Sequence, residues 1–61
     1  MNKEQKLKLI RGLHAKTLNL RALTRDHFNA DGWDTEENGK KAARLLDEII
    51  DMSTLIRNEL T

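Results

Sequence analysis

The chain has 61 residues, with 11 basic and 10 acidic side chains and a formal net charge of +1. Cysteine is absent, which excludes disulfides and thiolate metal sites, and no apolar run resembles a signal sequence or a membrane span, so a cytoplasmic protein is expected. A domain this small buries only about 60% of the surface that its unfolded chain exposes. Small chains without disulfides or metals commonly gain stability by self-association, so we expect a homodimer.

The composition favours helices. Valine, tyrosine and proline are absent, whereas leucine, lysine, arginine, glutamate and alanine, which are good helix formers, are abundant. The expected fold is all-α, with one domain over residues 1–61. It is an antiparallel hairpin of a helix near residues 3–28, an acidic loop at 29–34 and a helix near 35–60, and it dimerises into a four-helix bundle.

The first predicted helix carries its apolar residues mainly on one face. The spacing of three and four residues places together Leu9, Ile10, Leu13, Leu20, Leu23 and Phe28. Gly12 lies inside this helix and weakens it by about 1 kcal/mol relative to alanine. The apolar period continues in phase across Gly12, which indicates one long helix, although the sequence leaves open a break there.

The connection runs from Asn29 to Asp34, and its Asn, Asp and Gly residues tolerate turn conformations. Asp34 followed by Glu37 has the form of a capping box, which predicts a helix start near Asp34 or Thr35. The pair Asn38-Gly39 favours a later start near Lys40, and the sequence leaves this choice open.

The second predicted helix has the clearest apolar pattern. Steps of four and three form a heptad seam of Ala42, Leu46, Ile49, Ser53, Ile56 and Leu60. The seam is widened to about half the circumference by Ala43, Leu45, Ile50 and Met52. A face this broad suits a helix with two neighbours in a four-helix bundle. Whether the two hairpins pair parallel or antiparallel is left open.

The residues that commonly perform catalysis are sparse. Ser53 is the only serine and lies in the apolar seam, while His14 and His27 are about 20 Å apart along one helix. The acidic loop fails as a calcium loop, because His27 and Asn38 occupy the positions of the first ligand and of the bidentate glutamate. We therefore expect no enzymatic activity, no metal, no cofactor and no small-molecule substrate.

A basic strip on the first helix is the best functional candidate. Residues 1–28 carry seven basic and two acidic side chains, and the strip comprises Lys3, Leu7, Arg11, His14, Leu18, Arg21 and Arg25. The leading hypothesis is a regulatory protein whose strip docks on an acidic, apolar groove of a host or regulatory protein. The alternative is RNA or DNA bound through Lys3, Arg11, Arg21 and Arg25, and a third possibility is a purely structural subunit. Trp33 either folds over the open end of the bundle or anchors a partner.

Three segments resemble the Rop family of plasmid copy-number proteins. They are Met1-x-Lys3-x-x-Lys6, Thr17-Leu18-Asn19-Leu20 and the acidic Ala30-Asp31 turn. The resemblance implies a helical hairpin that dimerises into a four-helix bundle, and binding of paired RNA loops through the first helix. Lys3 matches a family lysine in that binding face, whereas Leu13 and His14 stand where the family has an aromatic residue. In size and charge the chain is also similar to small phage accessory proteins that bind a host factor.

Overall fold

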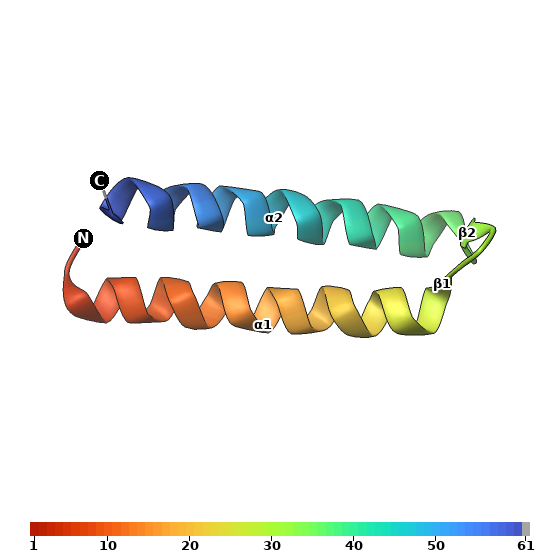
Figure 1. The fold of residues 1–61 in the computed structure, drawn as a ribbon, viewed down its shortest axis with the longest axis horizontal. Coiled ribbons are helices and arrows are strands. Elements are labelled where there is room, and N and C mark those ends of the chain that lie inside the picture. The colour runs from red at the N-terminus through yellow and green to blue at the C-terminus, as the bar shows by residue number, and fades with distance from the viewer. Residues whose placement is uncertain (61) are drawn as a thin grey trace.

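Two long helices form an antiparallel hairpin. The computed structural model describes residues 1–60, with the backbone alone for Leu60. Helix α1 spans Lys3–His27, strand β1 Phe28–Asn29, strand β2 Gly32–Trp33 and helix α2 Glu36–Leu60. The helices lie side by side, with both ends of the chain at one end of the hairpin and the strand pair at the other (Figure 1). The predicted all-α hairpin is confirmed, and each predicted helix boundary beside the turn lies within one residue of the observed one.

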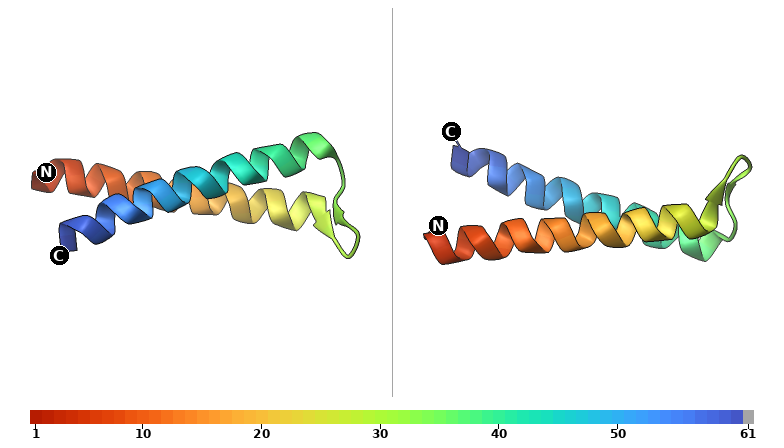
Figure 2. Two further views of the ribbon diagram at one scale, coloured as in Figure 1. Left: turned by 90° about the horizontal axis from the view of Figure 1, so that it is seen from above. Right: turned by 60° about the horizontal axis from the view of Figure 1, so that its bottom comes forward.

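The hairpin is a rod, 43 Å long and 16 Å across in each of the other two directions. Two further views show that the helices cross at a shallow angle and remain adjacent along their lengths (Figure 2). Neither helix, within the described residues, is long and apolar enough to cross a membrane.

The start of α1 is fixed by a capping box. The backbone N–H of Gln5 donates to Oδ1 of Asn2 at 2.8 Å, and the backbone N–H of Asn2 donates to Oε1 of Gln5 at 3.1 Å. Each side chain thus satisfies a backbone donor that the helix itself leaves without an acceptor. At the other end, Phe28 adopts an extended conformation, so α1 stops at His27.

The helix passes through Gly12 without a break, which settles the question that the sequence left open. Met52 of α2 packs directly over this residue, because a Cβ atom built on Gly12 would lie 2.7 Å from the Met52 side-chain methyl group. Gly12 therefore lowers the helix propensity of α1 but allows the two helices to approach closely at this level.

Helix α2 begins at Glu36, not near Lys40, because Thr35 caps it. The backbone N–H of Asn38 donates to Oγ1 of Thr35 at 3.1 Å, and the backbone N–H of Gly39 donates to the Thr35 carbonyl at 3.1 Å. The capping box predicted for Asp34 and Glu37 is wrong. The Thr35 hydroxyl accepts from the backbone N–H of Asn38, which has no acceptor within the helix. The Asp34 carboxylate therefore does not cap the helix and accepts instead from the Asn38 side-chain amide at 2.9 Å.

The connection contains a short antiparallel strand pair, where a plain loop was predicted. Phe28 pairs with Trp33 and Asn29 with Gly32, around a two-residue loop. Oδ1 of Asn29 accepts from the backbone N–H of Asp31 at 2.9 Å, and Gly32 has a φ of 99°, which a glycine adopts without steric cost. The strand pair fixes where the chain reverses between the two helices.

The seam between the helices is shallow. The large apolar side chains that face it are only partly buried: Leu9, Leu13, Leu20, Leu23, Leu45, Ile49, Met52 and Ile56. Among the described residues only Ala42 counts as buried, at 2% exposure. Leu46 and Ser53 of the predicted seam stay exposed, and Leu45 and Met52 take the half-buried positions instead. The side chain of Leu60 lies outside the described residues.

The contact between Gly12 and Met52 predicts non-additive mutations. Gly12→Ala is expected to raise the free energy of unfolding by less than the full helix-propensity gain of about 1 kcal/mol, because the new methyl group displaces Met52. In a Met52→Ala background the full gain is expected. Chemical denaturation of the four proteins of this double-mutant cycle measures the difference.

The matched control is Ala15→Gly, since Ala15 is an exposed residue of the same helix. This change is expected to lower the free energy of unfolding by about 1 kcal/mol through propensity alone. An identical effect of Gly12→Ala with and without the Met52 side chain would contradict the packing described here.

Candidate partner-binding surface

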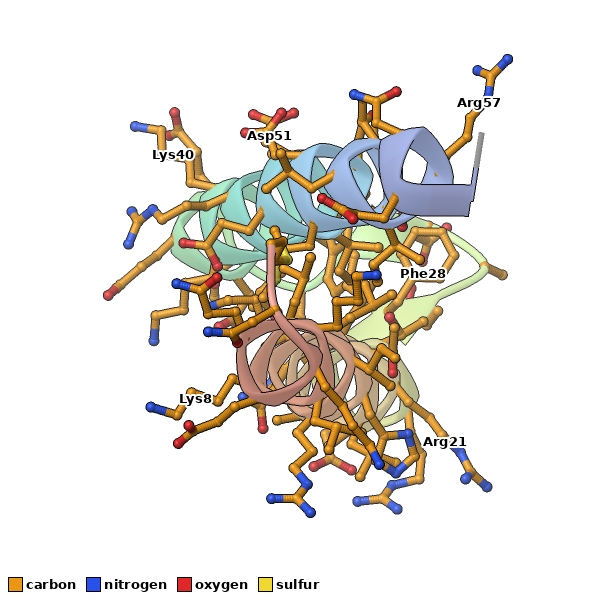
Figure 3. All side chains as sticks on the ribbon, turned by 90° about the vertical axis from the view of Figure 1, so that its left-hand side faces the viewer. Lys8, Arg21, Phe28, Lys40, Asp51 and Arg57 are labelled. Carbon is orange, nitrogen blue, oxygen red and sulfur yellow. The ribbon has the colours of Figure 1, made fainter. Side chains whose placement is uncertain are left out.

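The predicted basic strip forms the surface of α1 that points away from α2, here named the outer face. It comprises Lys3, Leu7, Arg11, His14, Leu18, Arg21 and Arg25, and every one of these side chains is exposed. At 100° per residue they cluster opposite the seam positions of α1. Seen along the hairpin, Arg21 projects below α1 while α2 lies above it (Figure 3). The structure thus places all seven residues on one open surface.

The cations of α1 fall into two groups according to their partners. Lys6 and Lys16 reach across to α2, where Nζ of Lys6 lies 3.5 Å from Glu59 and Nζ of Lys16 lies 2.7 Å from Glu48. In contrast, three cations of the outer face make no ion pair with any described residue: Lys3, Arg11 and Arg21. The unpaired positive charge of α1 is therefore concentrated on its outer face, apart from Lys8.

Lys8 lies on another side of the helix. In the view along the hairpin it projects to the left, whereas Arg21 projects down and to the right (Figure 3). Lys3 and Arg21 are eighteen residues apart, so the three unpaired cations of the outer face extend over about 27 Å along the helix axis.

Arg25, at the turn end of the outer face, is neutralised by its sequence neighbour. Its Nε donates to Oδ1 of Asp26 at 3.0 Å. This hydrogen bond, together with the attraction of the opposite charges, raises the pKa of Arg25 and lowers that of Asp26. Both side chains are exposed, so Asp26 can exchange Arg25 for solvent or for another acid at small cost.

Two leucines interrupt the charges of the outer face. Leu7 is 42% exposed and Leu18 is 47% exposed, and neither belongs to the half-buried seam. Each lies one turn from basic residues, Leu7 between Lys3 and Arg11 and Leu18 beside Arg21. A surface that alternates cations with exposed leucines complements an acidic surface that also carries apolar depressions.

A second exposed surface is apolar and lies beside the seam. We name it the apolar flank; its exposed large residues are Ile10, Phe28, Leu46 and Ile50, between 46% and 59% exposed. Ile10, Leu46 and Ile50 lie on the same side of the hairpin. Each is rotated away from the seam in the same sense about its own helix axis, and because the two helices are antiparallel and face each other, this rotation leads to the same side. Figure 3 shows Phe28 on this side and Lys8 on the opposite one.

Trp33 belongs to the turn and is not part of the outer face. Its ring lies 5.0 Å, centroid to centroid, from that of Phe28, at an interplanar angle of 57°. A Cβ atom on Gly39 would contact the indole at 3.4 Å, so Trp33 packs against the first turns of α2. The half-buried position supports the interpretation that Trp33 covers the end of the hairpin.

The turn also joins His27, Asp34 and Asn38, a network that sequence reasoning missed. Nδ1 of His27 lies 2.7 Å from Oδ2 of Asp34, and the Asn38 amide donates to Oδ1 of the same carboxylate at 2.9 Å. The Asn38 hydrogen bond, followed by that of His27, lowers the pKa of Asp34. The only signal in the sequence was an Asp flanked by polar residues at spacings of seven and four, which is too common to predict a network.

Two shallow hollows lie along the seam, and neither is lined by His or Ser. The first, about 120 Å³, is lined by Lys6, Leu9, Ile10, Ile56 and Glu59; the second, about 390 Å³, is lined by Asn19, Leu23, Lys41, Arg44, Leu45 and Glu48. Within residues 1–59, no three His, Asp or Glu side chains are placed to hold a metal ion.

Comparison with models of protein families found no match, and comparisons with curated proteins and with solved structures found none either. The fold and the site therefore define a class only, that of a helical hairpin with a basic outer face and an apolar flank. The resemblance to Rop stays a prediction.

The lowered pKa of Asp34 predicts a weaker turn in acid. A carboxylate whose pKa is depressed by folding stabilises the fold above its unfolded value, about 3.9, and that contribution is lost as the pH falls further. The melting temperature followed by circular dichroism is expected to fall below pH 4. Asp34→Asn keeps the shape without the charge, so this variant is expected to melt lower at pH 7 and to lose less on acidification.

Other carboxylates also protonate in this range, and Asp47→Asn supplies the comparison, because Asp47 is exposed and makes no hydrogen bond or ion pair with the described residues. The melting temperature of Asp47→Asn should fall with pH in the same way as that of the unchanged protein. If Asp34→Asn and Asp47→Asn respond alike at every pH, the turn network does not stabilise the fold.

Proposed function

We propose that this protein is a non-enzymatic regulatory or accessory protein that acts as a homodimer and binds another protein through the outer face of α1. The observation that carries the proposal is the arrangement of Lys3, Arg11 and Arg21, which are exposed on one face without ion pairs. Lys6 and Lys16 of the same helix are engaged by α2, and Arg25 is engaged by Asp26. The outer face is therefore the surface on which binding an acidic partner breaks the fewest existing interactions.

The chemistry of the outer face favours a protein partner. Leu7 and Leu18 lie about 16 Å apart along α1, and both are more than 40% exposed. Phosphate backbones offer nothing to an exposed leucine, whereas an acidic surface with apolar depressions buries both kinds of side chain. A host or regulatory protein with such a surface, in the cytoplasm, is the partner that we propose.

The alternative is a nucleic acid. Unpaired cations along about 27 Å of helix suit a phosphate backbone, and they would give a strong dependence of affinity on salt. The outer face has no aromatic side chain on which bases could stack, because Phe28 and Trp33 lie at the turn. The face can thus supply electrostatic attraction but little recognition of bases, so we rank this alternative second.

The surface that the single hairpin exposes supports the proposed homodimer. Its accessible surface is 4963 Å². A compact monomer of 7.1 kDa is expected to expose about 4,100 Å², so the hairpin exposes about 900 Å² in excess. A standard protein–protein interface buries about 800 Å² on each partner. Association of two hairpins into a four-helix bundle would remove this excess and cover the apolar flank.

Charge reversal on the outer face tests the binding proposal. Arg11→Glu/Arg21→Glu is expected to lose any protein that the unchanged chain captures from host lysate and to leave the helix content unchanged. The matched control is Lys8→Glu/Arg44→Glu, which changes the net charge equally at exposed residues away from the outer face. The control is expected to retain the captured protein, as identified by mass spectrometry.

A salt titration decides between protein and nucleic acid. Fluorescence anisotropy with a labelled RNA hairpin and a labelled DNA duplex is expected to show no binding at micromolar protein in 150 mM salt. Salt-dependent binding that disappears in Arg11→Glu/Arg21→Glu but not in the control would establish the nucleic-acid alternative. In the capture experiment, loss of the captured protein from both Arg11→Glu/Arg21→Glu and Lys8→Glu/Arg44→Glu would contradict a specific role of the outer face.

Dilution tests the homodimer. Light scattering is expected to give the mass of two chains at tens of micromolar. Circular dichroism is expected to show helix loss together with dissociation at lower concentration, because the seam of one hairpin buries so little. A well-folded monomer with a cooperative melt at every concentration would refute the homodimer.

A further inference from the structure

The apolar flank of α2 has the symmetry of a surface that pairs with itself. Its residues Ala43, Leu46, Ile50 and Ser53 are all exposed and are placed symmetrically about position 48, which is also the midpoint of α2. The two large residues lie at the centre of this stripe and the two small ones at its ends. If two such helices pack antiparallel about that midpoint, Leu46 faces Ile50 of the second copy, and Ala43 faces Ser53.

The corresponding stripe of α1 is symmetric in the same way. Ile10, Leu13, Thr17 and Leu20 are placed symmetrically about position 15, the midpoint of α1. Thr17 is apolar in effect, because its hydroxyl donates to the carbonyl of His14 at 2.7 Å and so requires no further acceptor. The stripe can therefore be covered by apolar side chains without leaving a polar group unsatisfied.

The two midpoints lie at the same level of the hairpin. Lys16 of α1 bonds to Glu48 of α2 at 2.7 Å, and Gly12 contacts Met52. A single two-fold axis, perpendicular to the helices and passing through the middle of the hairpin, would thus map each stripe onto itself. Homodimers with such an axis use the same patch on both subunits.

We infer that a second copy covers the apolar flank in an antiparallel arrangement, with the turns of the two hairpins at opposite ends of a four-helix bundle. The inference rests on the homodimer proposed above and specifies its geometry. In this arrangement α1 lies beside α1 of the second copy and α2 beside α2, and all neighbouring helices run antiparallel. Leu7, Arg11 and Leu18 of the outer face point away from this interface, whereas Lys3 and Arg21 lie at its border.

The charges at the two ends of the hairpin favour this arrangement over the one with both turns together. Over residues 25–41 the turn end carries five carboxylates against Arg25, Lys40 and Lys41, and these two lysines pair with Glu36 and Glu37. The turn end therefore keeps a net charge of −2 (3 − 5), whereas the opposite end has +2 (4 − 2) from Lys3, Lys6, Lys8 and Arg57 against Glu4 and Glu59. An antiparallel dimer brings each acidic turn next to the basic end of the second copy. A dimer with both turns together would instead place two ends of net negative charge side by side, and like charges repel.

The distance between the two turns tests the arrangement directly. The chain has no cysteine, so Ala30→Cys, an exposed position in the turn, gives one labelling site per copy. Double electron–electron resonance on the spin-labelled dimer is expected to give a separation of about 40 Å, because the hairpin is 43 Å long. A separation of half this length or less would overturn the antiparallel arrangement while leaving the homodimer intact.

A matched pair of variants tests the surface. Ile50 is 59% exposed on the apolar flank, and Leu55 is 48% exposed on another side of the same helix. Sedimentation is expected to show that Ile50→Lys weakens dimerisation at least tenfold and that Leu55→Lys changes it less than threefold. Equal effects of the two substitutions would overturn the assignment of the flank.

The two proposals fail separately. Arg11 lies on the side of α1 that faces away from both α2 and the flank, so Arg11→Glu is expected to dimerise like the unchanged protein and to keep the long distance between the turns. Loss of partner binding with the dimer retained therefore concerns the outer face alone. A protein that stays monomeric at every concentration overturns both the homodimer and the geometry inferred for it.

Discussion

The structure depends on a single seam between two helices of 25 residues each. One helix can bury only a narrow stripe of another, and here the stripe leaves its leucines and isoleucines half-exposed, with Ala42 alone counted as buried in the described chain. The packing energy of such a seam is small in relation to the entropy of ordering two long helices. The helix caps, the strand pair and the turn network supplement this seam.

The ends of the hairpin supplement it with hydrogen bonds. Asn2 and Gln5 close the start of α1, and Thr35 closes the start of α2, so neither helix relies on packing alone at its first turn. The strand pair and the bonds of Asp34 then limit how the two helices leave the turn. Gly12 and Met52 set a close approach midway along the seam. These contacts give a thin hairpin a defined register.

The remaining surface divides into parts with different chemistry, and this division underlies both proposals. The outer face of α1 gathers cations without partners, whereas the flank gathers apolar residues from both helices. Lys6 and Lys16 reach across the seam to Glu59 and Glu48, so their charges are compensated within the hairpin. One surface can thus serve self-association and the other a different macromolecule, without competition between them.

The sequence by itself determined the helices, their approximate ends, the chain reversal and the basic strip of α1, because helical periodicity and turn residues are local properties. It did not predict the strand pair, the cap at Thr35 or the network around Asp34, which depend on a few short polar side chains with several possible partners. Only the tertiary structure decided that Leu45 and Met52 face α1 while Leu46 and Ile50 remain exposed. A helix with a broad apolar face can rotate about its axis and still bury a similar amount of apolar surface. The rotation is selected by contacts with the facing helix, such as that of Met52 with Gly12, and a local sequence pattern does not contain these contacts.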